Sequence, residues 1–334
     1  MSVSRCVVVV VLAAGLCAGC AQKPKPAVVK KPPKPWIGVR SLVIFPMTPT
    51  ASHAEPQEVA DAMTAGWKKR LVSVPEGAEL VRVSGARHGN AMEEMFIDLS
   101  NVKVEADGKN KKLKPRGPTL RTLSVDRFEF VAQPLLVERS RFLINMTATD
   151  ATLDVRRDKQ GRSMVTLTNA REGALTLEVP KKDVDLLMLD VGRKMAGPYG
   201  VAIDSTKLKL DVEDHVLKAD LRVTTRLGGF LPAGLRFKAR VDIDDQLNGK
   251  ITRLSCSGDQ MLGPVISSIN NPALAKYEGK VKPLVGFHLG DMTLKDLQLA
   301  SGDSFKIDIK FGTGPRPKPT EARQRVATGT GTGF

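Results

Sequence analysis

Residues 235–243 read LRFKARVDI, and every second side chain in this stretch is apolar. Successive side chains of a β-strand point to opposite faces of the sheet, so a period of two predicts a strand with one apolar and one polar face. The same alternation returns many times between residues 91 and 311. The further runs cover residues 97–99, 123–130, 142–148, 153–155, 165–167, 175–179, 208–212, 217–223, 294–299 and 305–311.

Short turns separate these runs. Turn-forming residues stand at 158–161, 213–214, 244–249 and 301–303. Links of this length join neighbouring strands in antiparallel order. The sequence therefore predicts a mainly β chain of the α+β class, built on one long antiparallel meander sheet.

Two amphipathic helices interrupt the strands, at residues 180–195 and 263–277, and Pro272 is expected to end or kink the second. A sheet with one apolar face must cover that face, so it is predicted to curve around the two helices. Such a wrap encloses either a solid core or an apolar groove, and both alternatives stay open. The candidate groove residues are Val184, Leu187, Met188, Val191 and Met195 on the first helix, Val265, Ile266 and Ile269 on the second, and Phe237 and Val241 on a strand.

The first residues resemble a secretory signal. Arg5 precedes the apolar run 7–16, which is shorter than the ~20 residues that span a bilayer, and small residues lead to Cys20. This pattern predicts a lipoprotein whose mature chain starts at a diacylated Cys20, facing the periplasm and anchored to a membrane. Cys17 occupies the place where such signals usually carry Leu, so a plain signal peptide cleaved nearby is the alternative. Ala21 slightly favours the outer membrane over the inner one.

Composition divides the rest of the chain. The expected parts are a signal peptide at 1–19, a lipidated cysteine with a Pro/Lys linker at 20–35, a small α/β unit at 36–90, a β domain at 91–311 and a disordered tail at 312–334. Within the small unit, a strand is predicted at 39–45 and a helix at 55–71. No role for this unit follows from its sequence.

The formal charge of the chain is +15, which favours partners that carry phosphate. Aromatic residues make up only 4% of the chain, which leaves little material for stacking on bases, and nucleic acid is not expected as a partner. A solvated basic surface with polybasic tails near anionic lipid is the simpler explanation. Cys256 is the one cysteine expected in the folded part, as a small buried residue.

No catalytic signature is present. The four histidines stand at isolated positions, and the sequence contains neither a nucleophile-elbow motif nor a phosphate-binding loop. Asp183, Asp185 and Asp190 are explained by a helix start and a solvated helix face. The chain is therefore predicted not to be an enzyme, and no cofactor or metal is expected.

Residues 173–187, GALTLEVPKKDVDLL, followed by the strand 206–212, resemble the middle of the LmeA-like bacterial phospholipid-binding domain family. The order of the later elements agrees over about 220 residues, whereas the insert 107–116 and the unit before residue 91 depart from the family. The resemblance implies half of a tubular lipid-binding-like fold, in which a bent sheet wraps a helix around an acyl-chain groove. It also implies phospholipid binding in the periplasm.

A phosphate headgroup needs cations at the mouth of such a groove. The candidate mouth residues are the basic Lys181, Lys182, Arg193, Lys194, Arg226 and Arg236, and Phe230 and Leu231 in an apolar loop. That loop either dips into a bilayer or folds back on the core. The expected function is binding, with transfer as an extension, of phospholipid or a similar acyl lipid. The alternative is a structural or assembly lipoprotein that binds another envelope protein.

Overall fold

The computed structural model describes residues 43–50, 54–87, 90–104, 118–158, 160–196, 201–213, 215–227, 230–244, 248–260, 263–283 and 292–313. The predicted signal peptide, Cys20, the linker and most of the predicted tail lie outside the described residues. So do the side chains of the groove candidates Met195, Ile266 and Ile269.

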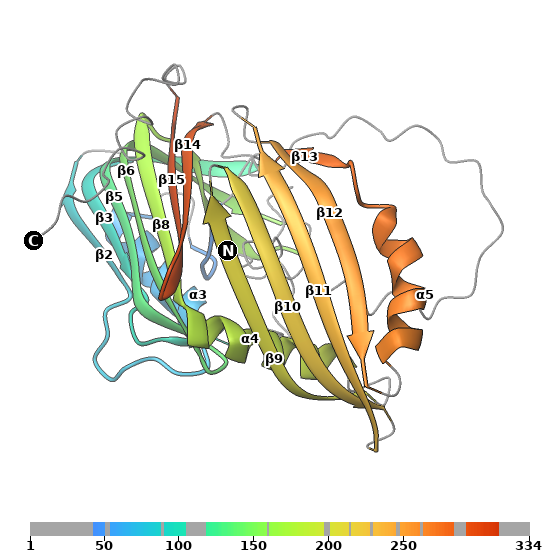
Figure 1. Ribbon diagram of the computed structural model, residues 1–334. Helices are drawn as coiled ribbons and strands as arrows, with labels where there is room; N and C mark the ends of the chain where they lie inside the picture. Colours follow the sequence, from blue (N-terminus) through green and yellow to red (C-terminus); the bar gives the residue numbers. More distant parts are fainter. Residues whose placement is uncertain are drawn as a thin grey trace, which may run out of the picture.

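The described chain is mainly β and forms two sheets that stand side by side (Figure 1). The first sheet has ten strands: β1 (Val43–Pro46), β2 (Val81–Ala86), β3 (Ala91–Asp98), β4 (Lys103–Val104), β5 (Thr119–Val137), β6 (Ser140–Arg157), β7 (Ser163–Asn169), β8 (Glu172–Pro180), β14 (Thr293–Ser301) and β15 (Ser304–Gly312). The second sheet has five: β9 (Val201–Glu213), β10 (Val216–Leu227), β11 (Leu231–Ile243), β12 (Asn248–Asp259) and β13 (Val281–Pro283).

Three helices accompany the sheets: α3 (Pro56–Lys68), α4 (Lys181–Ala196) and α5 (Gly263–Ala275). All three were predicted from apolar periodicity. Pro272 neither ends nor breaks α5, which continues to Ala275. The predicted strands are present, but β2, β12 and β13 were not expected.

The prediction of one antiparallel sheet is wrong in two respects. The main path of the first sheet runs β14-β15-β8-β6-β5-β3-β2, and both β3 and β4 pair with β5 in parallel. The second sheet is a separate meander, and β13-β12-β11-β10-β9 is its order. Where the sheets meet, the Val212 amide of β9 donates to the hydroxyl of Ser301, the last residue of β14, at 3.1 Å. A side chain thus takes the place of the backbone ladder that would have made one sheet.

Irregular pairing explains why two strands were misjudged. The sequence predicted separate strands at 142–148 and 153–155, whereas β6 is continuous. Asp150 has a positive φ of 46°, and the register with β5 omits it, so the buried face changes phase there. In β12 a similar irregularity lies opposite Arg240 and Val241, which hides the alternation of that strand.

The first sheet closes over one large core. Phe45 of β1 and Met63 of α3 are 1% and 0% exposed, and they share this core with Phe128 of β5 and Phe142 of β6. β1 also pairs with β7. Residues on both sides of the boundary expected at residue 90 therefore contribute to the same core.

Candidate functional site

Helix α4 lies at the junction of the two sheets, and it crosses beneath both in Figure 1. Leu187, 4% exposed, packs into the core of the first sheet, and Val191 packs against the same core. Met188, 3% exposed, belongs instead to the small core of the second sheet. Val184 contacts both cores. The apolar face that the sequence placed in one groove is therefore divided between two sheets.

Two aspartates in the first turns of α4 hold it in this place. The Asp183 carboxylate accepts hydrogen bonds from the Arg141 side chain at 2.7 Å and from the Arg141 amide at 3.2 Å, which ties α4 to β6. The Asp185 carboxylate accepts one from the Leu208 amide at 2.6 Å, which ties it to β9. Asp183 is only 3% exposed, so a solvated helix face does not explain it. Asp185 also covers part of the open edge of β9, where the Leu208 amide would otherwise lack a hydrogen-bond acceptor in the protein.

The second sheet has the apolar face that the alternation predicts. Its register aligns one buried row across four strands, and its members are between 2% and 4% exposed: Leu208, Leu221, Phe237 and Cys256. Burial raises the pKa of the Cys256 thiol to about 11, which keeps it protonated at neutral pH. This is the buried, inert cysteine that the sequence indicated.

Farther along the same strands, the inner face is less covered. Beyond an intervening row that holds Leu210, Ala219, Ala239 and Leu254, the following row consists of Val212, Leu217, Val241 and Ile251. Leu217 is 7% exposed, whereas the other three are only partly buried. Ile243 at the end of β11 is partly exposed as well. The inner face of the second sheet is thus closed near α4 and partly open at its other end.

Helix α5 lies along the edge of the second sheet (Figure 1). The Asn271 side chain accepts a hydrogen bond from the Cys256 amide and donates one to its carbonyl, both at 2.8 Å. The Glu278 carboxylate accepts one from the Leu254 amide at 2.7 Å. These side chains satisfy the edge of β12 as a further strand would. The groove candidate Val265 is 56% exposed and faces away from the core.

Glycines allow α5 to begin so close to the strands. A Cβ on Gly258 of β12 would overlap the carbonyl of Gly263, the first residue of α5. A Cβ on Gly263 would lie 2.6 Å from the carbonyl oxygen of Gly234 in β11. Both approaches require a residue without a side chain. The sequence signalled neither contact.

Most of the candidate headgroup cations are already bound within the protein. Arg226 and Arg236 form ion pairs with Asp204 and Asp220, and these arginines lower the pKa of both carboxyls. The other engaged side chains are Arg193, which donates to the Ile203 carbonyl, and Lys194, which pairs with Glu138.

The remaining mouth candidates are accessible. Lys181 and Lys182 at the start of α4 are exposed. Phe230 is 74% exposed, so its side chain does not pack on the core, and Leu231 is partly buried. The structure therefore does not bring the predicted mouth residues together around one opening.

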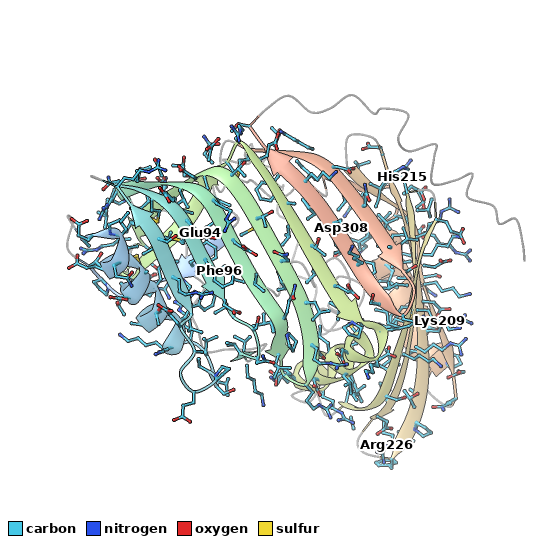
Figure 2. All side chains as sticks on the ribbon, turned by 90° about the vertical axis from the view of Figure 1, so that its left-hand side faces the viewer. Glu94, Phe96, Lys209, His215, Arg226 and Asp308 are labelled. Atoms are coloured by element: carbon cyan, nitrogen blue, oxygen red, sulfur yellow. The ribbon has the colours of Figure 1, made fainter. Side chains whose placement is uncertain are left out.

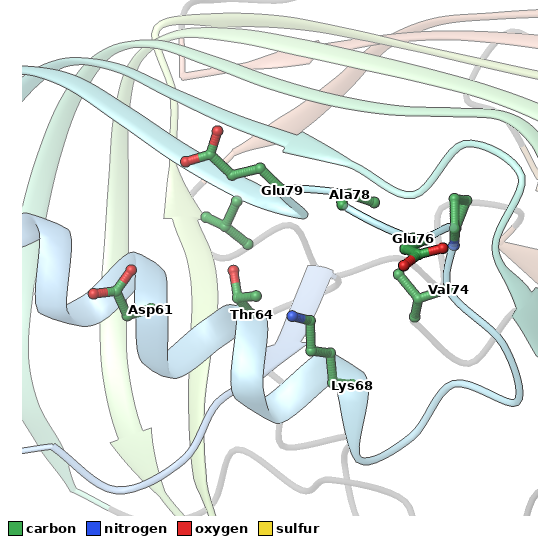
Figure 3. Close-up of a pocket in the computed structure, with 10 residues that line it drawn as sticks. Asp61, Thr64, Lys68, Val74, Glu76, Ala78 and Glu79 are labelled. Carbon is green, nitrogen blue, oxygen red and sulfur yellow. The ribbon is translucent and has the colours of Figure 1, made fainter.

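Two pockets occur at other places in the described structure. The larger, about 510 Å³, lies between α3 and the segment 74–81, where Asp61, Lys68, Glu76 and Glu79 give it a charged lining (Figure 3). The smaller, about 180 Å³, includes Leu120 and residues of β6 and β7. Neither is lined by α4, α5 or the second sheet. A lipid groove beside α4 thus stays a prediction.

Within the part of the chain that the structure describes, no group of three or more histidine, cysteine or acidic residues is arranged to hold a metal ion. No helix there is both long and apolar enough to cross a bilayer. A scan against protein-family models and searches among curated proteins and solved structures each gave no match.

Proposed function

We propose that this protein is a non-enzymatic, membrane-anchored lipoprotein that binds phospholipid or a similar acyl lipid on the inner face of the second sheet. One observation carries the proposal. The inner positions of β9–β12 are mostly apolar, yet Val212, Val241 and Ile243 are only partly buried, in contrast to the inner apolar side chains of β5 and β6 in the first sheet, which are buried. Exposed apolar surface is costly in water and often marks a binding surface.

The dimensions of this face suit an acyl chain. A strand of 12 residues, such as β10, is about 40 Å long, which exceeds the roughly 15 Å depth of one leaflet of a bilayer. The aliphatic rows offer dry contacts without fixed polar partners, as an acyl chain requires. Helix α4, placed where the sheets meet, supports the finer proposal of half a tubular lipid-binding-like fold. The alternation of the strands and the resemblance to the LmeA-like family point the same way.

The anchor belongs to the same proposal. A lipidated Cys20 would hold the folded part on the periplasmic side of a membrane, the outer membrane being slightly favoured. Tethering keeps the apolar face close to the lipid of that membrane. The effective concentration of lipid at this face is therefore raised.

The test is the lipid content of the purified Cys20→Ser protein, measured by native mass spectrometry and lipid extraction. We expect co-purifying acyl lipid. Val241→Asn, on the inner face, should lower it at least about tenfold, because a buried amide without a partner costs more than 1 kcal/mol. Val216→Asn is the matched control, since Val216 lies opposite Asp242 on the outer face. Lipid-free parent protein, or equal losses in both variants, would refute the proposal.

A second candidate is a structural or assembly lipoprotein that binds another envelope protein. The burial of Leu187 and Met188 favours it, since the junction beside α4 is filled where a groove was expected. Cross-linking in intact cells distinguishes the two. A defined protein adduct on the second sheet, without bound lipid, supports the second candidate over the first.

A further inference from the structure

The outer face of the second sheet is strongly basic. Its residues alternate with the apolar ones, so Lys207 and Lys209 flank the buried Leu208 on β9 and point to the opposite side. Lys209 and Arg226 mark this face in Figure 2. Helix α4 contributes Met188 to the inner core of this sheet, and α5 contributes Leu274. The basic side chains therefore lie on the other side of the sheet.

The strand register places like charges next to one another. Arg222 of β10 lies directly opposite Lys207 of β9 and directly opposite Arg236 of β11. Arg240 of β11 lies opposite Arg253 of β12. Like charges in opposed positions destabilise a sheet. These like-charge contacts therefore do not contribute to the stability of the sheet.

The acidic residues nearby do not neutralise the surface. Four of them are each paired with one base, as Asp204–Arg226, Asp220–Arg236, Asp242–Arg240 and Glu213–Lys218. Six exposed bases of this face form no ion pair with any residue that the structure describes: Lys207, Lys209, Arg222, Lys238, Lys250 and Arg253. The face keeps an excess of positive charge after its own pairs are made.

The outer face of the first sheet is different. Arg127 of β5 pairs with Glu94 of the neighbouring β3, and Lys306 of β15 lies opposite Glu178 of β8. Arg82 stacks on the Phe96 ring at 4.6 Å. Opposite charges or an aromatic ring meet each of these bases. These bases of the first sheet are matched by a partner, in contrast to the six unpaired bases of the second sheet.

We propose that the outer face of the second sheet docks on an anionic lipid bilayer through its unpaired lysines and arginines. The positive charge of this face favours a polyanionic partner. Its width and its lack of aromatic side chains favour a bilayer over a nucleic acid. The face is about 20 Å wide, too broad for the roughly 12 Å major groove of DNA. The strand positions on this face carry no aromatic side chain for stacking on single-stranded bases. A bilayer offers a plane of mobile phosphates, which fits a flat array of cations.

The inference does not depend on the lipid groove, because it concerns the opposite side of the sheet. Each basic residue near an anionic bilayer strengthens binding about fivefold. The test compares the full chain carrying Cys20→Ser with a variant that adds Lys207→Gln, Arg222→Gln and Lys238→Gln. Partitioning is measured by sedimentation with phosphatidylcholine vesicles containing about 30 mol% phosphatidylglycerol. We expect the triple variant to bind about a hundredfold more weakly. The N-terminal segment contributes equally to both proteins.

The matched control removes three bases from the first sheet, as Lys295→Gln, Lys306→Gln and Lys310→Gln, with the same change of net charge. It should retain binding within about fivefold. Removal of Lys207 and Arg222 relieves repulsion, which offsets the lost attraction between Lys238 and the opposite Asp220. The triple variant should therefore keep its thermal unfolding temperature, and this measurement shows that it folds. Equal losses in the two triple variants, or equal binding of the parent to neutral vesicles, overturn the proposal. So does a preference for heparin or duplex DNA over the anionic vesicles at equal salt, because the partner would then not be a bilayer.

Discussion

The two sheets of this protein share the same alternation of apolar and polar residues, but their apolar faces are buried to different degrees. In the first sheet, the apolar side of β5 and β6 is closed by α3 and β1, and Phe128 is completely buried. In the second, the apolar side ends in partly exposed residues such as Val241, and the polar side carries unpaired charge. Alternation alone thus predicts a two-faced strand, whereas the covering elements decide whether an apolar face is fully buried or stays partly exposed.

Truncation of one side chain on the inner face of each sheet should give the largest difference in the free energy of unfolding. Phe128→Ala is expected to lower the free energy of unfolding by about 4 kcal/mol, because it leaves a cavity in a tightly packed core. Val241→Ala should lower it by less than about 1 kcal/mol, because this side chain is already partly in water. Equilibrium unfolding in urea measures both. Similar losses at the two positions would show that the second sheet is as closed as the first.

The next effect concerns the attachment of α4. Asp183→Ala should cost about 2–3 kcal/mol, because it leaves the Arg141 side chain and amide without their buried acceptor. Asp190→Ala, which removes the more exposed ion pair with Arg139, should cost about 1 kcal/mol or less. Urea unfolding of the two variants makes the comparison. Equal costs would contradict the account of α4 as the element that joins the sheets.

A smaller effect is expected where α5 meets the second sheet. Gly258→Ala should destabilise the protein by about 1–3 kcal/mol, because the new Cβ would overlap the Gly263 carbonyl. Gly302→Ala is the control, since nothing lies within 4 Å of its Cβ position. Hydrogen exchange should show faster opening of α5 in the first variant alone. An unchanged α5 would mean that the helix can move without loss.

Relief of charge repulsion should have a small effect of opposite sign. Arg222→Thr is expected to raise the free energy of unfolding by a few tenths of a kcal/mol at low salt, since it removes a base that faces two others. Lys306→Thr, opposite Glu178 on the first sheet, should lower it slightly. Thermal unfolding at low and high salt measures the direction of the stability change in both variants. A destabilised Arg222→Thr would show that the basic rows are compensated in the folded state.

Cys256 gives a test that needs no substitution of the core. Because the pKa of the buried thiol is raised to about 11, a thiol reagent should react with it at pH 8 only as fast as the protein unfolds. The folded state holds this proton more tightly than the unfolded chain. Its contribution to stability is therefore fully present below about pH 8.5 and is lost as the pH rises toward 11. Rapid labelling of the native protein would contradict this burial.

The sequence predicted the strands and helices well where their periods are regular. It failed where one residue shifts the phase, as at Asp150 in β6, because the alternation of buried side chains changes phase at a residue that the pairing with β5 omits. The sequence also failed to predict which strands pair, because no local pattern shows that β3 runs parallel to β5. Chain direction and pairing depend on contacts between distant segments.

The candidate site was predicted in part for the same reason. The apolar stripe of α4 was recognised, but only the folded chain divides it between Leu187 and Met188. Arg226 and Arg236 were expected to meet a headgroup, whereas Asp204 and Asp220 accept their hydrogen bonds. The basic outer face needs the register of β9–β12, which places Lys207 opposite Arg222 although 15 positions separate them in the chain.

The central claim is that the inner face of the second sheet holds an acyl chain. Its most direct test is cross-linking with a phospholipid that carries a photoreactive group on the acyl chain, with the adducts located by mass spectrometry. The account predicts adducts at the partly exposed inner residues of the second sheet, among them Val212, Val241 and Ile243. It predicts none in the closed core around Phe128. Adducts confined to the outer face, or a protein that captures no lipid, would contradict the claim.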